Sequence, residues 1–193
     1  MTLNSGGTLA AGSAPGSMSS MSTTSSFSTM SGGGSQVGTL MATSATWNSG
    51  STFEFEIINA TGFIGVDWDL LDVSGALNLS GISASSKMNL TVLSSGLMNY
   101  DPNTQYSWVF AQAASLTGAE SWTTGLDVTD RFTITSSGFN GGVGPGQGFK
   151  VLTGTDGGGL RTLSLQSVPE PNSASLIIIG LATVAPLRRK RAA

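Results

Sequence analysis

The chain has 193 residues, of which 10% are charged and 27 are Gly, and it contains neither Cys nor His. These absences exclude a Ser-His-Asp triad, a Cys nucleophile, a disulfide-stapled core and a metal site built from His or Cys. Soluble domains average about 25% charged residues and about 7% Gly, so this composition argues against an ordinary helical enzyme. The length allows one domain of about 130 to 150 residues.

Charge is unevenly distributed along the chain. Arg188, Arg189, Lys190 and Arg191 form a basic cluster that holds four of the eight basic residues. The rest of the chain has four basic against eleven acidic side chains, a net charge of −7. Such a body has no basic stripe that could neutralise phosphates, so nucleic acid is not an expected partner.

The first 36 residues have low complexity. Of the 53 residues that precede Glu54, the first charged residue, 32 are Gly, Ser or Thr. This composition predicts a flexible, uncharged linker over residues 1–36. The alternative is a set of thin β coils, in which Ser and Thr alternate with Leu9, Met18, Met21, Phe27 and Met30.

Residues 37–167 show the period-2 alternation that is typical of β-strands. The clearest case is the segment 53–57, in which Phe, Phe and Ile alternate with two Glu. Residues 69–79 repeat the pattern, with Gly75 at a position where a β-bulge fits. Further short alternations begin at residues 88, 106, 132, 149 and 163 and are separated by turn residues. No sustained 3.6-residue period occurs before residue 172, so we expect almost no helix there.

Many short strands at fairly even spacing predict an all-β domain, either a solenoid of β coils or a β-sandwich. Residues 6–18, the strand around Glu54 and residues 66–81 together resemble the closing portion of passenger proteins built from autotransporter-associated β-strand repeats. This resemblance covers roughly residues 6–93 and implies a right-handed β-solenoid. We therefore rank the solenoid above the sandwich.

Residues 168–193 contain a Pro-containing motif, an apolar stretch and a basic cluster, in that order. An uncharged apolar stretch from Leu176 to Leu187 precedes the basic cluster. These 12 residues make about 18 Å of helix against a hydrocarbon core of about 30 Å, so residues 172–187 predict one short, weakly held transmembrane helix. The basic cluster stays on the cytoplasmic side under the positive-inside rule, which places the acidic body across the membrane. Ahead of the apolar stretch lies a motif that consists of Val168, Pro169, Glu170 and Pro171.

This order of motif, apolar span and basic cluster resembles the PEP-CTERM sorting signal of bacterial envelope proteins. The resemblance implies recognition by an exosortase, a membrane-embedded, Cys-dependent, transpeptidase-like enzyme that removes the anchor near the motif. It further implies an inner-membrane intermediate and then delivery to the cell surface or the extracellular polysaccharide matrix. A plain C-terminal anchor is the alternative. Residues 1–34 contain no charge and no apolar run of the kind found in a signal peptide, so we expect the true start of the precursor to lie upstream.

Two groups of residues are candidate ligand sites. Asp67, Asp69 and Asp72 offer hard oxygen ligands to Ca²⁺, although solvated carboxylates at a strand end are the alternative. Apart from Ca²⁺ we expect no cofactor. Trp122, in a polar loop, is the aromatic side chain that we expect to be exposed and able to stack on a sugar ring.

No pair of residues in the sequence indicates a catalytic site. Glu54 and Glu56 lie about 6 to 7 Å apart on one strand face, a spacing found in any strand with an acidic outer face. We therefore predict a noncatalytic envelope or matrix protein with a structural or adhesive role. A carbohydrate-binding module on the same export route is one alternative, and a fragment of a β-helix polysaccharide-degrading enzyme is another.

Overall fold

The computed structural model describes residues 1–11, 21–22, 27–31, 37–94, 96–118, 122–139 and 148–169. Among these residues, one 3₁₀ turn at Thr129–Arg131 is the only helical element. The larger of two sheets contains β1 (Thr2–Leu3), β3 (Met21–Ser22), β4 (Phe27–Ser31), β5 (Gly38–Ala42), β6 (Ala45–Asn48), β8 (Leu70–Gly81), β10 (Ser107–Thr117), β12 (Phe149–Thr155) and β13 (Arg161–Ser167). The smaller contains β2 (Thr8–Ala10), β7 (Thr52–Glu56), β9 (Met88–Leu93) and β11 (Phe132–Ser137).

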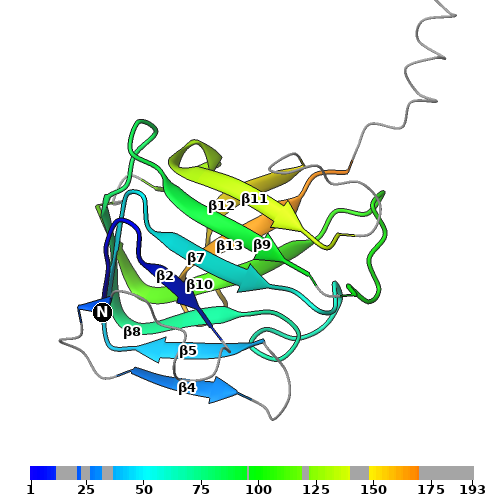
Figure 1. Ribbon diagram of the computed structural model, residues 1–193, viewed down its shortest axis with the longest axis horizontal. Helices are drawn as coiled ribbons and strands as arrows, with labels where there is room; N and C mark the ends of the chain where they lie inside the picture. Colours follow the sequence, from blue (N-terminus) through cyan, green and yellow to red (C-terminus); the bar gives the residue numbers. More distant parts are fainter. Residues whose placement is uncertain are drawn as a thin grey trace, which may run out of the picture.

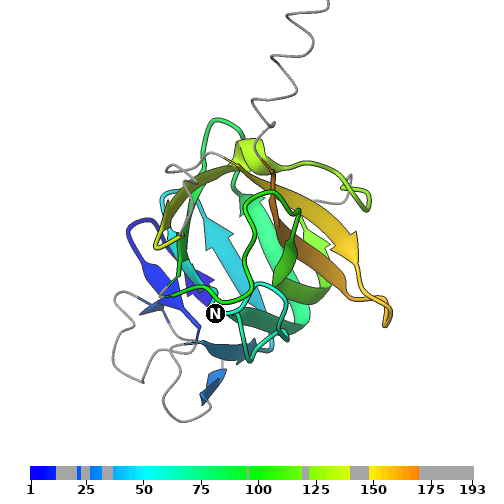
Figure 2. The ribbon, with the colours of Figure 1, turned by 90° about the vertical axis from the view of Figure 1, so that its right-hand side faces the viewer.

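From β6 to β12 the chain passes alternately through the two sheets, which enclose the interior between them (Figures 1 and 2). Strands from successive passes are parallel neighbours: β6 with β8 and β8 with β10 in the larger sheet, and β7 with β9 and β9 with β11 in the smaller. A parallel pair needs a crossover connection, and here each crossover contains a strand of the opposite sheet. The last two strands differ, because β12 and β13 form an antiparallel hairpin that pairs with β10. The all-β prediction is confirmed.

Inward-facing side chains stack in register across the parallel strands. In the smaller sheet Leu9 pairs with Phe53, Phe53 with Leu90, and Leu90 with Ile134, so four strands contribute to one buried column. A matching column in the larger sheet contains Leu40, Leu71, Ala111 and Leu163. The period-2 pattern of the sequence is thus realised as aligned rows of apolar side chains.

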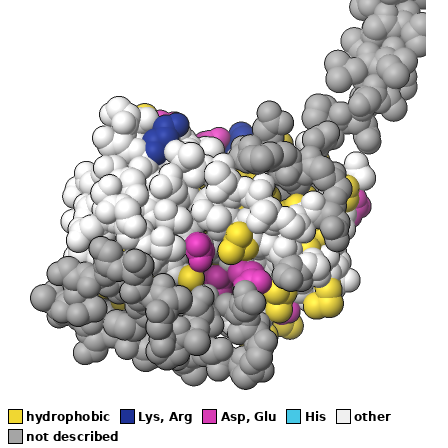
Figure 3. Space-filling view, in the orientation of Figure 1, with side chains coloured by type: hydrophobic (Ala, Val, Ile, Leu, Met, Phe, Trp, Pro, Cys, Tyr) yellow, Lys and Arg dark blue, Asp and Glu magenta, His cyan; other side chains and the backbone are white. Residues whose placement is uncertain are grey.

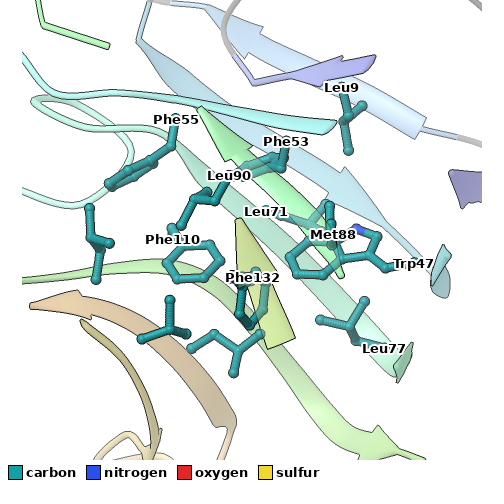
Figure 4. Packing of buried hydrophobic residues seen from close by; sticks show 14 of the residues in the cluster. Leu9, Trp47, Phe53, Phe55, Leu71, Leu77, Met88, Leu90, Phe110 and Phe132 are labelled. Atoms are coloured by element: carbon teal, nitrogen blue, oxygen red, sulfur yellow. The ribbon is translucent and has the colours of Figure 1, made fainter. Parts of the chain in front are cut away.

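Aromatic rings fill the space between the sheets (Figure 4). The ring of Phe110 lies 6.4 Å from that of Trp47, 6.1 Å from that of Phe53 and 5.8 Å from that of Phe55, measured between centroids. These separations are in the range of favourable aromatic pairs. All four side chains are fully buried, so strands of both sheets share one core.

The β-bulge predicted at Gly75 is confirmed in β8. Ala113 of β10 pairs with Val73, whereas Ser115 pairs with Ala76, so β8 carries one extra residue at this point. A Cβ atom on Gly75 would lie 2.5 Å from the carbonyl oxygen of Thr43, which sits in the break between β5 and β6. Gly is therefore required at position 75, where the bulge in β8 lies against the break between β5 and β6.

The predicted linker over residues 1–36 is wrong for residues 1–11. β1 pairs with β6 and β2 pairs with β7, both in parallel. Leu3 and Leu9 are fully buried in the same core as the rest of the domain. Composition suggested a linker because Gly, Ser and Thr dominate, but the buried Leu side chains and the strand pairings together bind this segment to the sheets.

The two ends of the molecule differ in their connections. At one end β7 and β9 finish and β8 and β10 begin, so that connections 57–69 and 94–106 lie there together with residues 168–169 after β13. We call this the exit end, because the chain passes there from the last strand toward the predicted sorting motif. The opposite end contains the connection 82–87 and the segment 122–131.

Candidate functional site

The exit end is held together by a series of hydrogen bonds that runs from the end of β13 to the β9–β10 connection. The N–H of Ser167 donates to the carbonyl of Tyr106 (2.9 Å), and the N–H of Tyr106 donates to Oγ of Ser167 (2.7 Å). The Tyr106 hydroxyl donates to the carbonyl of Asn99 (3.1 Å). Nδ2 of Asn99 in turn donates to Oδ1 of Asn59 (3.0 Å), in the connection between β7 and β8. Three segments far apart in the sequence are thereby fixed to one another.

The predicted sorting motif begins at this network. Val168 follows β13 directly, its N–H donates to the carbonyl of Gly148, and its side chain is exposed. Pro169 is half-buried. The remaining residues of the motif, Glu170 and Pro171, lie outside the described residues, as do the predicted transmembrane helix at 172–187 and the basic cluster at 188–191.

Four large apolar side chains are exposed on the same end. Phe63 is 77% exposed, Val66 64%, Met98 54% and Ile64 40%. Figure 3 shows hydrophobic side chains gathered on the side of the molecule where the β7–β8 and β9–β10 connections lie. Sequence reasoning missed this group, because a Phe or Val in a Gly-rich connection carries no periodic signal of exposure or burial.

The connection that carries Phe63 has a defined backbone. Oδ2 of Asp67 accepts the N–H of Phe63 (2.7 Å), and the N–H of Gly65 donates to the carbonyl of Trp68 (2.8 Å). The N–H of Ala60 donates to the carbonyl of Met98 (2.9 Å), which joins this connection to its neighbour. The apolar side chains are therefore displayed on a hydrogen-bonded frame.

The three Asp residues predicted as a Ca²⁺ site occupy three different environments, and their predicted grouping is wrong. Asp67 stabilises the connection just described, and Asp72 lies in β8 between Met41 and Gln112 of the neighbouring strands. Asp69 is buried and bonded to backbone N–H groups. Across the described parts of the chain, no three acidic side chains are placed to hold a metal ion.

Asp69 joins β5, β7 and the start of β8. Its Oδ1 accepts the N–H of Gly38 (2.8 Å), and its Oδ2 accepts the N–H of Glu56 (2.9 Å). Burial raises the pKa of Asp69 to about 8, against the lowering effect of these two hydrogen bonds, and the nearby carboxylates of Glu56 and Glu54 raise it further. The arrangement identifies Asp69 as a structural carboxyl group.

Glu56 departs from the acidic outer face expected for its strand. Glu54 is half-exposed, but Glu56 is only 8% exposed, and burial raises its pKa above the ordinary value. The alternation of residues 53–57 identified the strand correctly. It gave no sign that Asp69, thirteen residues away, lies against Glu56.

The prediction that Trp122 is exposed is wrong. Trp122 is 3% exposed, and the guanidinium carbon of Arg131 lies 4.8 Å from the centroid of its ring, a cation–π contact. Arg161 donates to the carbonyl of Trp122, and Arg131 donates to the carbonyl of Ile82 (3.2 Å). Arg131 and Arg161 therefore hold Trp122 in place at the opposite end of the domain. Its buried ring is not available to stack on a sugar.

Searches against family models, curated protein sequences and solved structures each find no match to the chain. Within residues 1–169, as far as the structure describes them, no helix has the length and hydropathy needed to cross a bilayer.

Proposed function

We propose that the chain is an exported bacterial envelope protein whose β domain is held at the membrane by the C-terminal segment and released when an exosortase cleaves near Glu170. One observation supports this proposal: the last strand, β13, ends at Ser167, and the predicted motif starts at Val168, whose N–H is bonded to the carbonyl of Gly148 while its side chain is exposed. Cleavage beyond this point leaves β13 and all its pairings intact. The domain is thus suited to survive removal of its tail.

We further propose that the domain is a short β-solenoid with a structural role. The alternate passage of the chain between two sheets and the parallel pairing of successive passes support stacked coils. The hairpin of β12 and β13 then covers the last coil of the larger sheet. In the two columns described above each strand contributes one buried side chain, so stacking between coils can stabilise the domain without a disulfide.

The outer face of the smaller sheet suits contact with a polysaccharide matrix. Along it, Nδ2 of Asn89 donates to Oγ1 of Thr52 (3.5 Å), and Oγ1 of Thr135 donates to Oγ1 of Thr91 (3.4 Å). Figure 3 shows mostly uncharged side chains on this face, with a group of acidic side chains near its centre, and Glu54 lies beside Thr91 in the same row. Hydroxyl and amide groups in rows offer both donors and acceptors to sugar hydroxyls. The proposed role is adhesive or structural and involves no catalytic residue.

The proposal predicts that Glu170→Ala blocks processing in the native host. With Glu170→Ala, we expect the full-length chain to accumulate in the membrane fraction, while the wild type appears as a shorter, released form. Asp130→Ala is the matched control, since it removes one exposed carboxylate at the opposite end of the domain. It should be processed like the wild type. Equal release of the Glu170→Ala chain would contradict the proposed sorting.

A further inference from the structure

We propose that the exit end is a membrane-contact surface, and that Phe63, Ile64, Val66 and Met98 rest in the bilayer interface as long as the tail is attached. The inference rests on the proposed function, because it requires residues 172–187 to hold the chain at a membrane. It adds an orientation: the strand connections of the exit end contact the lipid surface.

The first observation is the clustering of apolar side chains. Soluble proteins seldom expose several large apolar side chains together, and such patches mark contact with a protein or a membrane. Here they come from two neighbouring connections that are bonded to each other through Ala60 and Met98. Aromatic and aliphatic side chains on a fixed frame are the groups that enter the boundary between lipid headgroups and acyl chains.

The second observation is the place where the chain leaves the domain. The network from Ser167 through Tyr106 and Asn99 to Asn59 fixes the last strand to the connection that carries Phe63. Only the six residues 170–175 separate Pro169 from the apolar stretch that begins at Leu176. Six extended residues span at most about 20 Å. The apolar patch and the predicted anchor therefore share one end of the molecule, which selects a lipid surface as the occupant.

The third observation is charge. Connections 57–69 and 94–106 contain no Lys or Arg. Of their acidic side chains, Asp69 is buried. Asp67 and Asp101 accept hydrogen bonds within their own connections, from the N–H of Phe63 (2.7 Å) and the N–H of Asn103 (2.9 Å). Neither connection offers a basic group to anionic lipid, so the contact is apolar and phosphatidylcholine vesicles are a sufficient probe.

A labelling experiment tests the orientation. Because the chain has no Cys, Val66→Cys and Ala84→Cys each provide one thiol, the first in the apolar patch and the second in the exposed connection 82–87 at the opposite end. The full-length chain is labelled with an environment-sensitive fluorophore and reconstituted into phosphatidylcholine vesicles. We expect the emission at position 66 to shift to shorter wavelength with vesicles and the emission at position 84 to stay unchanged. Adding Phe63→Ser and Ile64→Ser to Val66→Cys should reduce the shift at least twofold without changing flotation with the vesicles.

Each other outcome has a distinct meaning. A chain that floats with vesicles but shows the same emission at position 66 as in buffer would overturn the orientation and leave the anchor intact. A shift at position 66 that needs no vesicles and grows with protein concentration would assign the patch to a second copy of the chain instead. A chain that does not float would contradict the anchor of the proposed function, and the inference would fall with it.

Discussion

Asp69 shows how a single residue can stabilise this fold and make it sensitive to pH. Its carboxyl group accepts N–H groups from Gly38 and Glu56, which belong to different strands, in a site where only 2% of the residue is exposed. A buried carboxyl group favours its neutral form, and the pKa of Asp69 is accordingly about 8 instead of 3.8. The folded chain therefore retains a proton that the unfolded chain releases.

The raised pKa of Asp69 predicts that the free energy of unfolding falls as pH rises from 5 to 8. Between 3.8 and about 8 the folded state binds one more proton than the unfolded state, so the free energy of unfolding decreases by up to about 1.4 kcal/mol per pH unit and levels off above pH 8. Glu56 acts in the same direction. The chain has no His to titrate in this window. Urea denaturation at pH 5, 6, 7 and 8 measures the slope.

Asp69→Asn tests the assignment. Its amide oxygen can accept only one of the two N–H groups, so we expect a loss of about 1 to 3 kcal/mol at pH 5. The decline between pH 5 and 8 should shrink to less than half, because Glu56 alone remains to cause it. An unchanged decline in Asp69→Asn would show that another group binds the proton. Glu56→Gln, which should retain most of the decline, is the matched control.

At the scale of elements, close approach between strand ends depends on Gly138. It follows β11 directly with φ +81°, and a Cβ atom there would lie 1.6 Å from the carbonyl oxygen of Ser94, just beyond β9. The N–H of Ser94 donates to the carbonyl of Ser137 (3.0 Å), so the two strands continue to pair at this point. Gly125 has a similar φ of +82° but open space around it.

This contrast predicts different costs for the same substitution. Gly125→Ala should lower the free energy of unfolding by about 1 to 2 kcal/mol, the cost of the left-handed conformation. Gly138→Ala should cost about 1 to 3 kcal/mol more, because the new methyl group also forces β9 and β11 apart. Denaturation monitored by circular dichroism measures both variants. Equal losses would show that the strand ends separate freely.

The strands themselves could be predicted from the sequence, because alternation is local. Phe53 and Phe55, Met88 and Leu90, and Leu163 and Leu165 all point inward as their spacing indicated. The bulge at Gly75 was predictable for the same reason. In each case the information lies within a few neighbouring residues.

Features that depend on long-range packing could not be predicted. Nothing near Trp122 indicates that Arg131 covers its ring, and nothing near Leu3 or Leu9 indicates that strands from residues 45–56 pair with them. In the sequence, Asp69 is one of three neighbouring acidic residues. Only the fold brings the N–H groups of Gly38 and Glu56 to its carboxyl group. For the candidate site, the sorting motif stays a prediction from the order of motif, apolar stretch and basic cluster, while the apolar patch at the exit end follows only from the topology.

At the scale of the whole molecule, the two ends of the domain have different chemistry. The exit end combines exposed apolar side chains with the start of the predicted motif. The opposite end holds Arg131 and Arg161 against Trp122 and is closed by polar connections. Under the proposed function and the proposed membrane contact, the domain would turn its outer faces sideways along the cell surface, and removal of the tail would free it without loss of any strand pairing.

The most direct test of this account is the mass of the C-terminal peptide of the protein isolated from its native host, with the exosortase present and with its gene deleted. We predict that the peptide ends near residues 168–171 when the enzyme is present and at Ala193 when it is absent. A C-terminus at Ala193 in both strains would contradict sorting by cleavage and would reduce residues 172–193 to a plain membrane anchor.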